Sequence, residues 1–118
     1  MNINPKIIAA LAPLGLAVRQ STYLLAEGEC EKPDQYFIFF TYSDQLGDWA
    51  SGKAIREDII GQVSLFSKLD WKELADQAVA LLRDAGFYAA LGQEFYEEET
   101  GYYHQIIDIE WHEDLYSR

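Results

Sequence analysis

Apolar residues recur at helical spacing in two stretches of the chain. In residues 4–14 a stripe of isoleucine and leucine follows Asn4 and Pro5, which suit the first turn of a helix, and the stripe ends at Gly15. In residues 70–85 the spacing is more regular, and the apolar positions are Trp71, Leu74, Ala75, Ala78, Leu81, Leu82 and Ala85. The pattern predicts an N-terminal helix and one long amphipathic helix that packs on a sheet.

Five other stretches have the character of β-strands. Residues 16–26 are rich in β-forming residues, and residues 35–42 are apolar enough to be covered on both faces. Residues 54–66 alternate between apolar and polar positions, as a half-buried strand does. Residues 87–96 and 102–111 are separated by five residues that include a glycine, which is typical of a hairpin. This order predicts an α+β domain, spanning the whole chain, with a largely antiparallel sheet of about five strands.

Between the second and third predicted strands, residues 43–53 are polar and contain two glycines around Trp49. We expect this segment to be a loop that is mobile in the free protein and orders in an assembly, because long loops of this kind often carry function. Trp49 either packs back onto the domain or anchors a partner.

The charge of the chain is strongly unbalanced. Its 118 residues include 9 Lys and Arg against 20 Asp and Glu, a formal net charge of −11. Such a surface repels phosphate groups, so a function that requires binding to nucleic acid or to an anionic membrane is disfavoured. From Asp84 to Ser117 there are nine acids and no Lys or Arg. These acids form either a solubilising surface or one that meets a basic partner or faces DNA without holding it.

Few side chains are candidates for catalysis or metal binding. Cys30, the single cysteine, lies between two glutamates whose charges disfavour the reactive thiolate. His104, Asp108 and His112 would share a helix face, but on a strand the two histidines are roughly 26 Å apart, too far for one metal ion. No phosphate-binding loop or nucleophile motif occurs. We therefore expect no catalytic residues, no metal and no cofactor, and hence not an enzyme.

The N-terminal apolar run is interrupted by Pro13 and Gly15. It therefore has the pattern of neither a signal peptide nor a membrane span, which needs about 20 apolar residues. We expect a soluble cytoplasmic protein without a membrane partner.

Four strings of the sequence stand out together. They are NPKIIAALAPLGLAV, QYFIFFTY followed by a polar loop, VSLFSKLDWKELADQAVALLRDAGF, and EFYEEETGYYHQIIDIEW. In this order they resemble the tail-completion proteins of Gram-positive phages and prophages, in the tail-terminator or head-to-tail joining group. The resemblance covers nearly the whole chain, and its most telling part is the aromatic and acidic hairpin from Glu94 to Gln105.

The resemblance implies a structural virion protein without catalytic activity. Such proteins form a ring, commonly of six copies, at the head-proximal end of the tail tube. The ring ends tube polymerisation and docks the head connector or stopper protein. The implied partners are therefore other copies of the chain, the major tail tube protein and the head connector, while DNA passes through without specific binding. The implied locations are the host cytoplasm during assembly and the tail–head junction of the virion.

Aromatic and acidic residues supply the candidate contacts, because eight tyrosines and three tryptophans exceed what a core of this size needs. The expected interface residues are Trp49, Asp48, Tyr96, Glu97, Glu98, Glu99 and Tyr102. Two alternatives remain open. One is another neck or head-completion protein of the same module. The other is a small acidic, inhibitor-like protein that masks a basic partner as a monomer.

Overall fold

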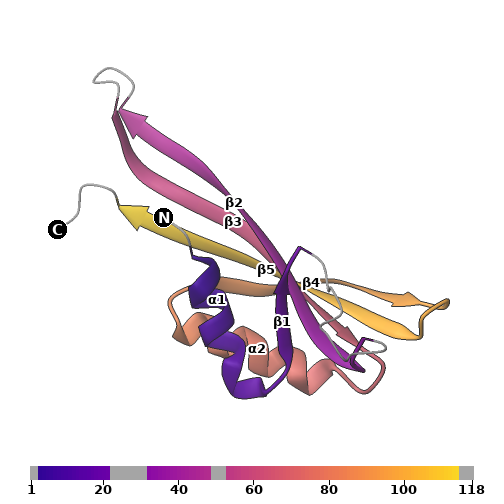
Figure 1. The fold of residues 1–118 in the computed structure, drawn as a ribbon. Helices are drawn as coiled ribbons and strands as arrows, with labels where there is room; N and C mark the ends of the chain where they lie inside the picture. The colour runs from indigo at the N-terminus through magenta and orange to yellow at the C-terminus, as the bar shows by residue number, and fades with distance from the viewer. Residues whose placement is uncertain (1–2, 22–31, 49–52, 115–118) are drawn as a thin grey trace.

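The computed structural model describes residues 3–21, 32–48 and 53–114, with side chains described outside residues 42–56 and 114. The elements, in chain order, are helix α1 (Asn4–Leu11), the 3-10 turn η1 (Ala12–Leu14), β1 (Ala17–Gln20), β2 (Gln35–Asp48), β3 (Lys53–Ser67), helix α2 (Lys72–Asp84), β4 (Tyr88–Glu97) and β5 (Tyr102–Asp114). Both helices lie on the same side of the sheet (Figure 1). The protein is therefore α+β with two layers.

The five strands form one sheet in the order β1-β2-β3-β5-β4. The pairings of β2 with β3, β3 with β5 and β4 with β5 are antiparallel, whereas β1 runs parallel to β2. The expected α+β class, five strands and two helices are confirmed, but the sheet is mixed. A parallel neighbour requires a long connection that returns along the sheet. The composition of residues 16–26 does not reveal that direction, and the strand there ends at Gln20.

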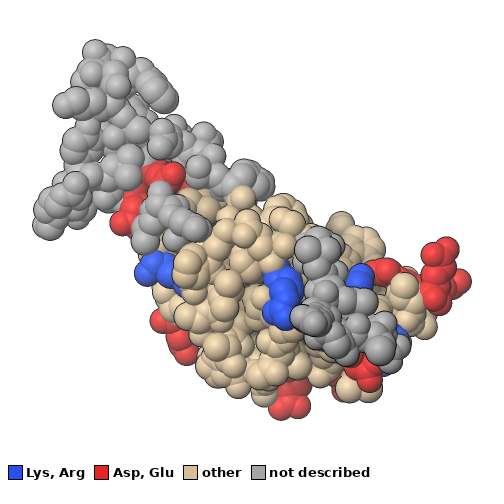
Figure 2. All heavy atoms as spheres, in the orientation of Figure 1, with Lys and Arg blue, Asp and Glu red and all other residues tan. Residues whose placement is uncertain are grey.

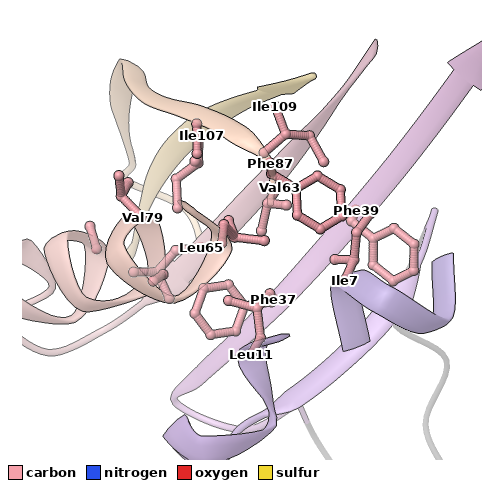
Figure 3. Close-up of a cluster of buried hydrophobic side chains, with 14 of the residues drawn as sticks. Ile7, Leu11, Phe37, Phe39, Val63, Leu65, Val79, Phe87, Ile107 and Ile109 are labelled. Atoms are coloured by element: carbon pink, nitrogen blue, oxygen red, sulfur yellow. The ribbon is translucent and has the colours of Figure 1, made fainter. Parts of the chain in front are cut away.

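The core lies between the helices and one face of the sheet. The face consists of Phe37, Phe39, Val63, Leu65, Ala89, Ile107 and Ile109, all buried. Against it pack Ile7 and Leu11 of α1 and Ala78, Val79 and Leu82 of α2 (Figure 3). These strand residues alternate along the chain, as expected for side chains that share one face of a pleated sheet.

Helix α2 has 13 residues and is shorter than the predicted helix at 70–85. Trp71 occupies the N-cap position, and Asp70 Oδ1 accepts a hydrogen bond from the Lys72 amide at 3.2 Å. The apolar residues of the stripe are not equally covered. Leu82 is fully buried while Leu81 is only partly buried, because Leu81 lies toward the edge of the face that meets the sheet.

The expectation of a loop at residues 43–53 is wrong for most of that segment. β2 continues to Asp48, and β3 begins at Lys53, in a register that runs from Gln35 opposite Ser67 to Asp48 opposite Lys53. Cross-strand pairing with the long strand β3 overrides the polar composition, because main-chain hydrogen bonds hold a strand in a sheet whatever its side chains. Residues 49–52, including Trp49, lie outside the described residues. The arm formed by these two strands extends beyond the helices (Figure 1).

Candidate functional site: the edge strand β4

Exposed apolar side chains gather on one strand. Among the described residues, eight large hydrophobic side chains are exposed by 41% or more. Four of them, Tyr88, Leu91, Phe95 and Tyr96, lie on β4, and Tyr103 of β5 lies directly opposite Tyr96. Single exposed apolar residues are ordinary, but a group on one element indicates a contact surface. We call these five residues the β4 patch.

The β4 patch presents apolar groups on both faces of the strand. Tyr88 and Phe95 are paired with Glu110 and His104, on the sheet face away from the helices. Leu91 and Tyr96 point to the side of the helices, as do their partners Ile107 and Tyr103. A partner that approaches along the edge of β4 would therefore meet apolar side chains above and below the plane of the sheet.

β4 is the last strand of the sheet. It pairs with β5 on one side, and the described residues place no strand on its other side. Its register shifts between Leu91 and Glu94, which marks a β-bulge. The buried amide of Gln105 holds this bulge by donating to the carbonyl oxygens of Gly92 at 3.1 Å and Ile106 at 2.8 Å. Bulges bend a strand and redirect its side chains.

A groove opens between the outer half of this hairpin and the beginning of α2. Its volume is about 570 Å³, and Leu69, Trp71, Tyr96 and Tyr103 are among its lining residues. The ring centroids of Tyr96 and Tyr103 are 4.7 Å apart, and those of Trp71 and Tyr103 are 6.1 Å apart. The groove therefore continues the β4 patch onto the side of the helices.

On the opposite face, four rings form a row across the sheet. Tyr36, Phe66, His104 and Phe95 are register partners on β2, β3, β5 and β4 in turn. Successive ring centroids are 5.0, 4.3 and 5.8 Å apart. Three of these rings are partly or fully buried, and Phe95 forms the exposed end of the row.

Tyr102 belongs to the interior of the protein. It is buried, its hydroxyl donates to the carbonyl oxygen of Pro33 at 2.7 Å, and its ring contacts Tyr36 and Phe66 edge-on. Of the two adjacent tyrosines, Tyr103 is the exposed one. Tyr102 was expected at the interface, but it instead holds the hairpin to the segment before β2.

The other expected interface residues fall into two separate places. Tyr96 and Glu97 end β4, and Glu98 and Glu99 form the exposed turn that follows. Figure 2 shows acidic atoms at this end of the molecule. Asp48 ends β2, at the tip of the other hairpin, and Trp49 lies outside the described residues. Figure 1 places the two hairpin tips at opposite ends of the molecule, so these residues do not form one site.

His104 is the ionisable member of the aromatic row. Its Nε2 is buried and has no hydrogen-bond partner among the described residues. Burial lowers the pKa of His104 below its ordinary value of 6.5, although the carboxylate of Glu97 acts in the opposite direction. The ring stacks on Phe66 and lies tilted against Phe95.

We expect acid to weaken the fold through His104. Between its lowered pKa and about 6.5, the unfolded chain binds a proton that the folded chain does not, so stability falls as pH falls through that window. NMR titration should place the midpoint of His104 below 6.5. Urea unfolding at pH 7 and pH 5 should show a smaller loss of stability in His104→Phe than in the parent protein. An equal loss in both proteins would contradict this assignment.

In residues 3–21, 32–48 and 53–114, no three or more His, Cys, Asp or Glu side chains are grouped so as to bind a metal ion. Neither α1 nor α2 is long and apolar enough to cross a membrane. His112 instead lies against Asp58, with 2.6 Å between Nδ1 and Oδ1, and joins β5 to β3.

No protein-family model matches the chain, and no curated protein matches it either.

Proposed function

We propose that this chain is a structural protein of a phage or prophage virion. In this proposal, copies form a ring that caps the head-proximal end of the tail tube, ends its polymerisation and joins it to the head connector. The observation that carries the proposal is the β4 patch, an open strand edge with exposed aromatic residues on both faces. It lies within the hairpin where the sequence most resembles tail-completion proteins, and the amphipathic pattern of residues 70–85 is part of the same resemblance.

A ring requires two different contact surfaces on each copy. A contact between unlike surfaces closes into a cyclic oligomer when the angle between copies permits, and otherwise produces a filament. The β4 patch supplies one surface at one edge of the sheet. The arm of β2 and β3 extends away from it and supplies a second, separate surface. Six copies are the number that the resemblance implies.

The charge of the chain supports the passage of DNA through such a ring. Glu94, Glu97, Glu98 and Glu99 are exposed on the β4–β5 hairpin, within a chain of net charge −11. A lumen with this charge repels phosphate, so DNA would pass without being retained. The proposed partners are thus other copies, the tube protein and the connector, in the host cytoplasm during assembly and then in the virion.

The exposed acidic turn also favours a second candidate function. A small protein could use these carboxylates to mask a basic partner, as inhibitor-like proteins do, and would then act as a monomer in a one-to-one complex. Another neck or head-completion protein of the same module would share the composition but stack elsewhere. The state of association and the effect on tube length separate these candidates.

Light scattering across a salt series tests the proposal. Copies of charge −11 repel one another at low ionic strength, and salt screens that repulsion, with a Debye length of about 10 Å at 0.1 M. We expect the measured mass to rise with salt, or to rise only when polymerised tail tube provides an end to bind. A protein that stays monomeric in every condition and leaves tube length unchanged would favour the inhibitor-like function.

A further inference from the structure

We infer that the outer edge of β4 pairs with the outer edge of β2 in a second copy, over residues 42–48, so that the sheet continues from copy to copy. This inference rests on the proposed ring and specifies its interface. The main-chain groups at the edge would provide the affinity, and the β4 patch would cover the new pairing on both faces.

β4 has the features of a strand that receives another strand. It is ten residues long and pairs on one side only, within the described part of the chain. Edge strands in proteins that stay monomeric are usually short or protected by lysine, proline, other charges or a β-bulge. β4 contains no lysine or proline, and its bulge and its carboxylates, Glu94 and Glu97, come after Leu91. Its inner half, with Tyr88 and Leu91, is thus an apolar edge without charge.

The matching open edge lies on β2. Among the described residues, β1 pairs with this strand from Tyr36 to Phe39, and the amide of Ser21 donates one further bond to the Phe39 carbonyl oxygen. Thr41 is joined to Asn4 by a hydrogen bond of 2.9 Å. Beyond it, residues 42–48 pair with β3 but have no strand on their other side among the described residues. Phe40, which is 42% exposed, lies just before this open stretch.

Two other pairings of edges are less favourable. β1 is only four residues long, so it would leave most of β4 unpaired. Pairing β4 with β4 of a second copy would be isologous, and it would give a closed dimer instead of a ring.

The topology fixes the direction of the proposed pairing. Within one copy, β2 is antiparallel to β3, β3 to β5, and β5 to β4. After these three reversals β4 runs opposite to β2. Rotation about a ring axis that lies along the strands leaves strand directions unchanged. β4 would therefore meet β2 of the next copy in the antiparallel arrangement, the slightly more stable one per residue.

Matched lysine variants test whether β4 is the contact. Leu91→Lys and Tyr88→Lys place a charge on opposite faces of β4, at residues that are 49% and 67% exposed. Ile8→Lys adds the same charge to α1, at a residue that is 45% exposed. We expect each β4 variant to weaken association by about tenfold or more, a free-energy change of about 1.4 kcal/mol. Ile8→Lys changes the net charge by the same amount but lies on α1. Its association should therefore stay within about twofold of that of the parent protein.

Amide hydrogen exchange identifies the strand that pairs with β4. In the associated protein, amides of β4 and of residues 42–48 should become protected together, while those of β1 should not change. Association without this joint protection, or with Leu91→Lys and Ile8→Lys equally affected, would overturn the inference. If the protein still shortened tubes, the proposed function would survive that result. If neither association nor a change in tube length occurred, both would fail.

Discussion

Replacing Phe39 with alanine is expected to lower the free energy of unfolding by about 3–5 kcal/mol. Phe39 is fully buried in the middle of the sheet, in the same cluster as Ile7 and Leu11 of α1 (Figure 3). Removing its ring leaves a cavity between the sheet and the helix, which the surrounding residues fill only in part. Chemical denaturation followed by circular dichroism would measure the loss.

Phe40 offers a control at the next position of the same strand. Its side chain points to the opposite face of the sheet and is 42% exposed. Phe40→Ala should therefore cost about 1 kcal/mol or less. It should weaken association instead, because this ring lies next to the proposed pairing on β2. Equal stability losses in Phe39→Ala and Phe40→Ala would contradict the difference in burial between these two neighbouring side chains.

Replacing Leu82 with alanine is expected to cost about 2–5 kcal/mol. Leu82 is fully buried on the face of α2 that packs on the sheet, together with Ala78 and Val79. The neighbouring Leu81→Ala is the control. It removes the same number of atoms from a side chain that is only partly buried, so it should cost clearly less. Thermal or urea unfolding of both variants tests how α2 is rotated about its axis. A larger cost at Leu81 would contradict the packing described.

Strong periodicity made much of the fold predictable. The alternation in residues 54–66 corresponds to β3 at Lys53–Ser67, and the apolar stripe of residues 70–85 contains α2 at Lys72–Asp84. In α2 one face is buried and the other solvated, and in β3 one parity is apolar and buried while the other is mostly polar and half-buried. The period of each element is therefore visible in the sequence. The extension of β2 to Asp48 could not be predicted in this way, because residues 43–48 are mostly polar and their place in the sheet comes from pairing with β3.

The candidate site was only partly predictable. Its place in the second hairpin follows from aromatic and acidic composition, but the choice between Tyr102 and Tyr103 does not. Neighbouring residues on a strand face opposite sides, and which side is covered depends on partners far along the chain. Tyr102 is buried because the register brings it beside Tyr36 and Phe66. The bulge at Gly92 and Gln93 further obscures the alternation along β4, so Leu91 and Phe95 were missed.

Tube length in the presence of this protein tests the central claim most directly. Major tail tube protein from the same phage or prophage would be polymerised with increasing amounts of the chain, and tube lengths would be measured by electron microscopy. The proposal predicts shorter tubes, each with a ring at one end, and a loss of this effect in Leu91→Lys but not in Ile8→Lys. Tubes of unchanged length with bare ends, even at a large excess of the chain, would contradict it.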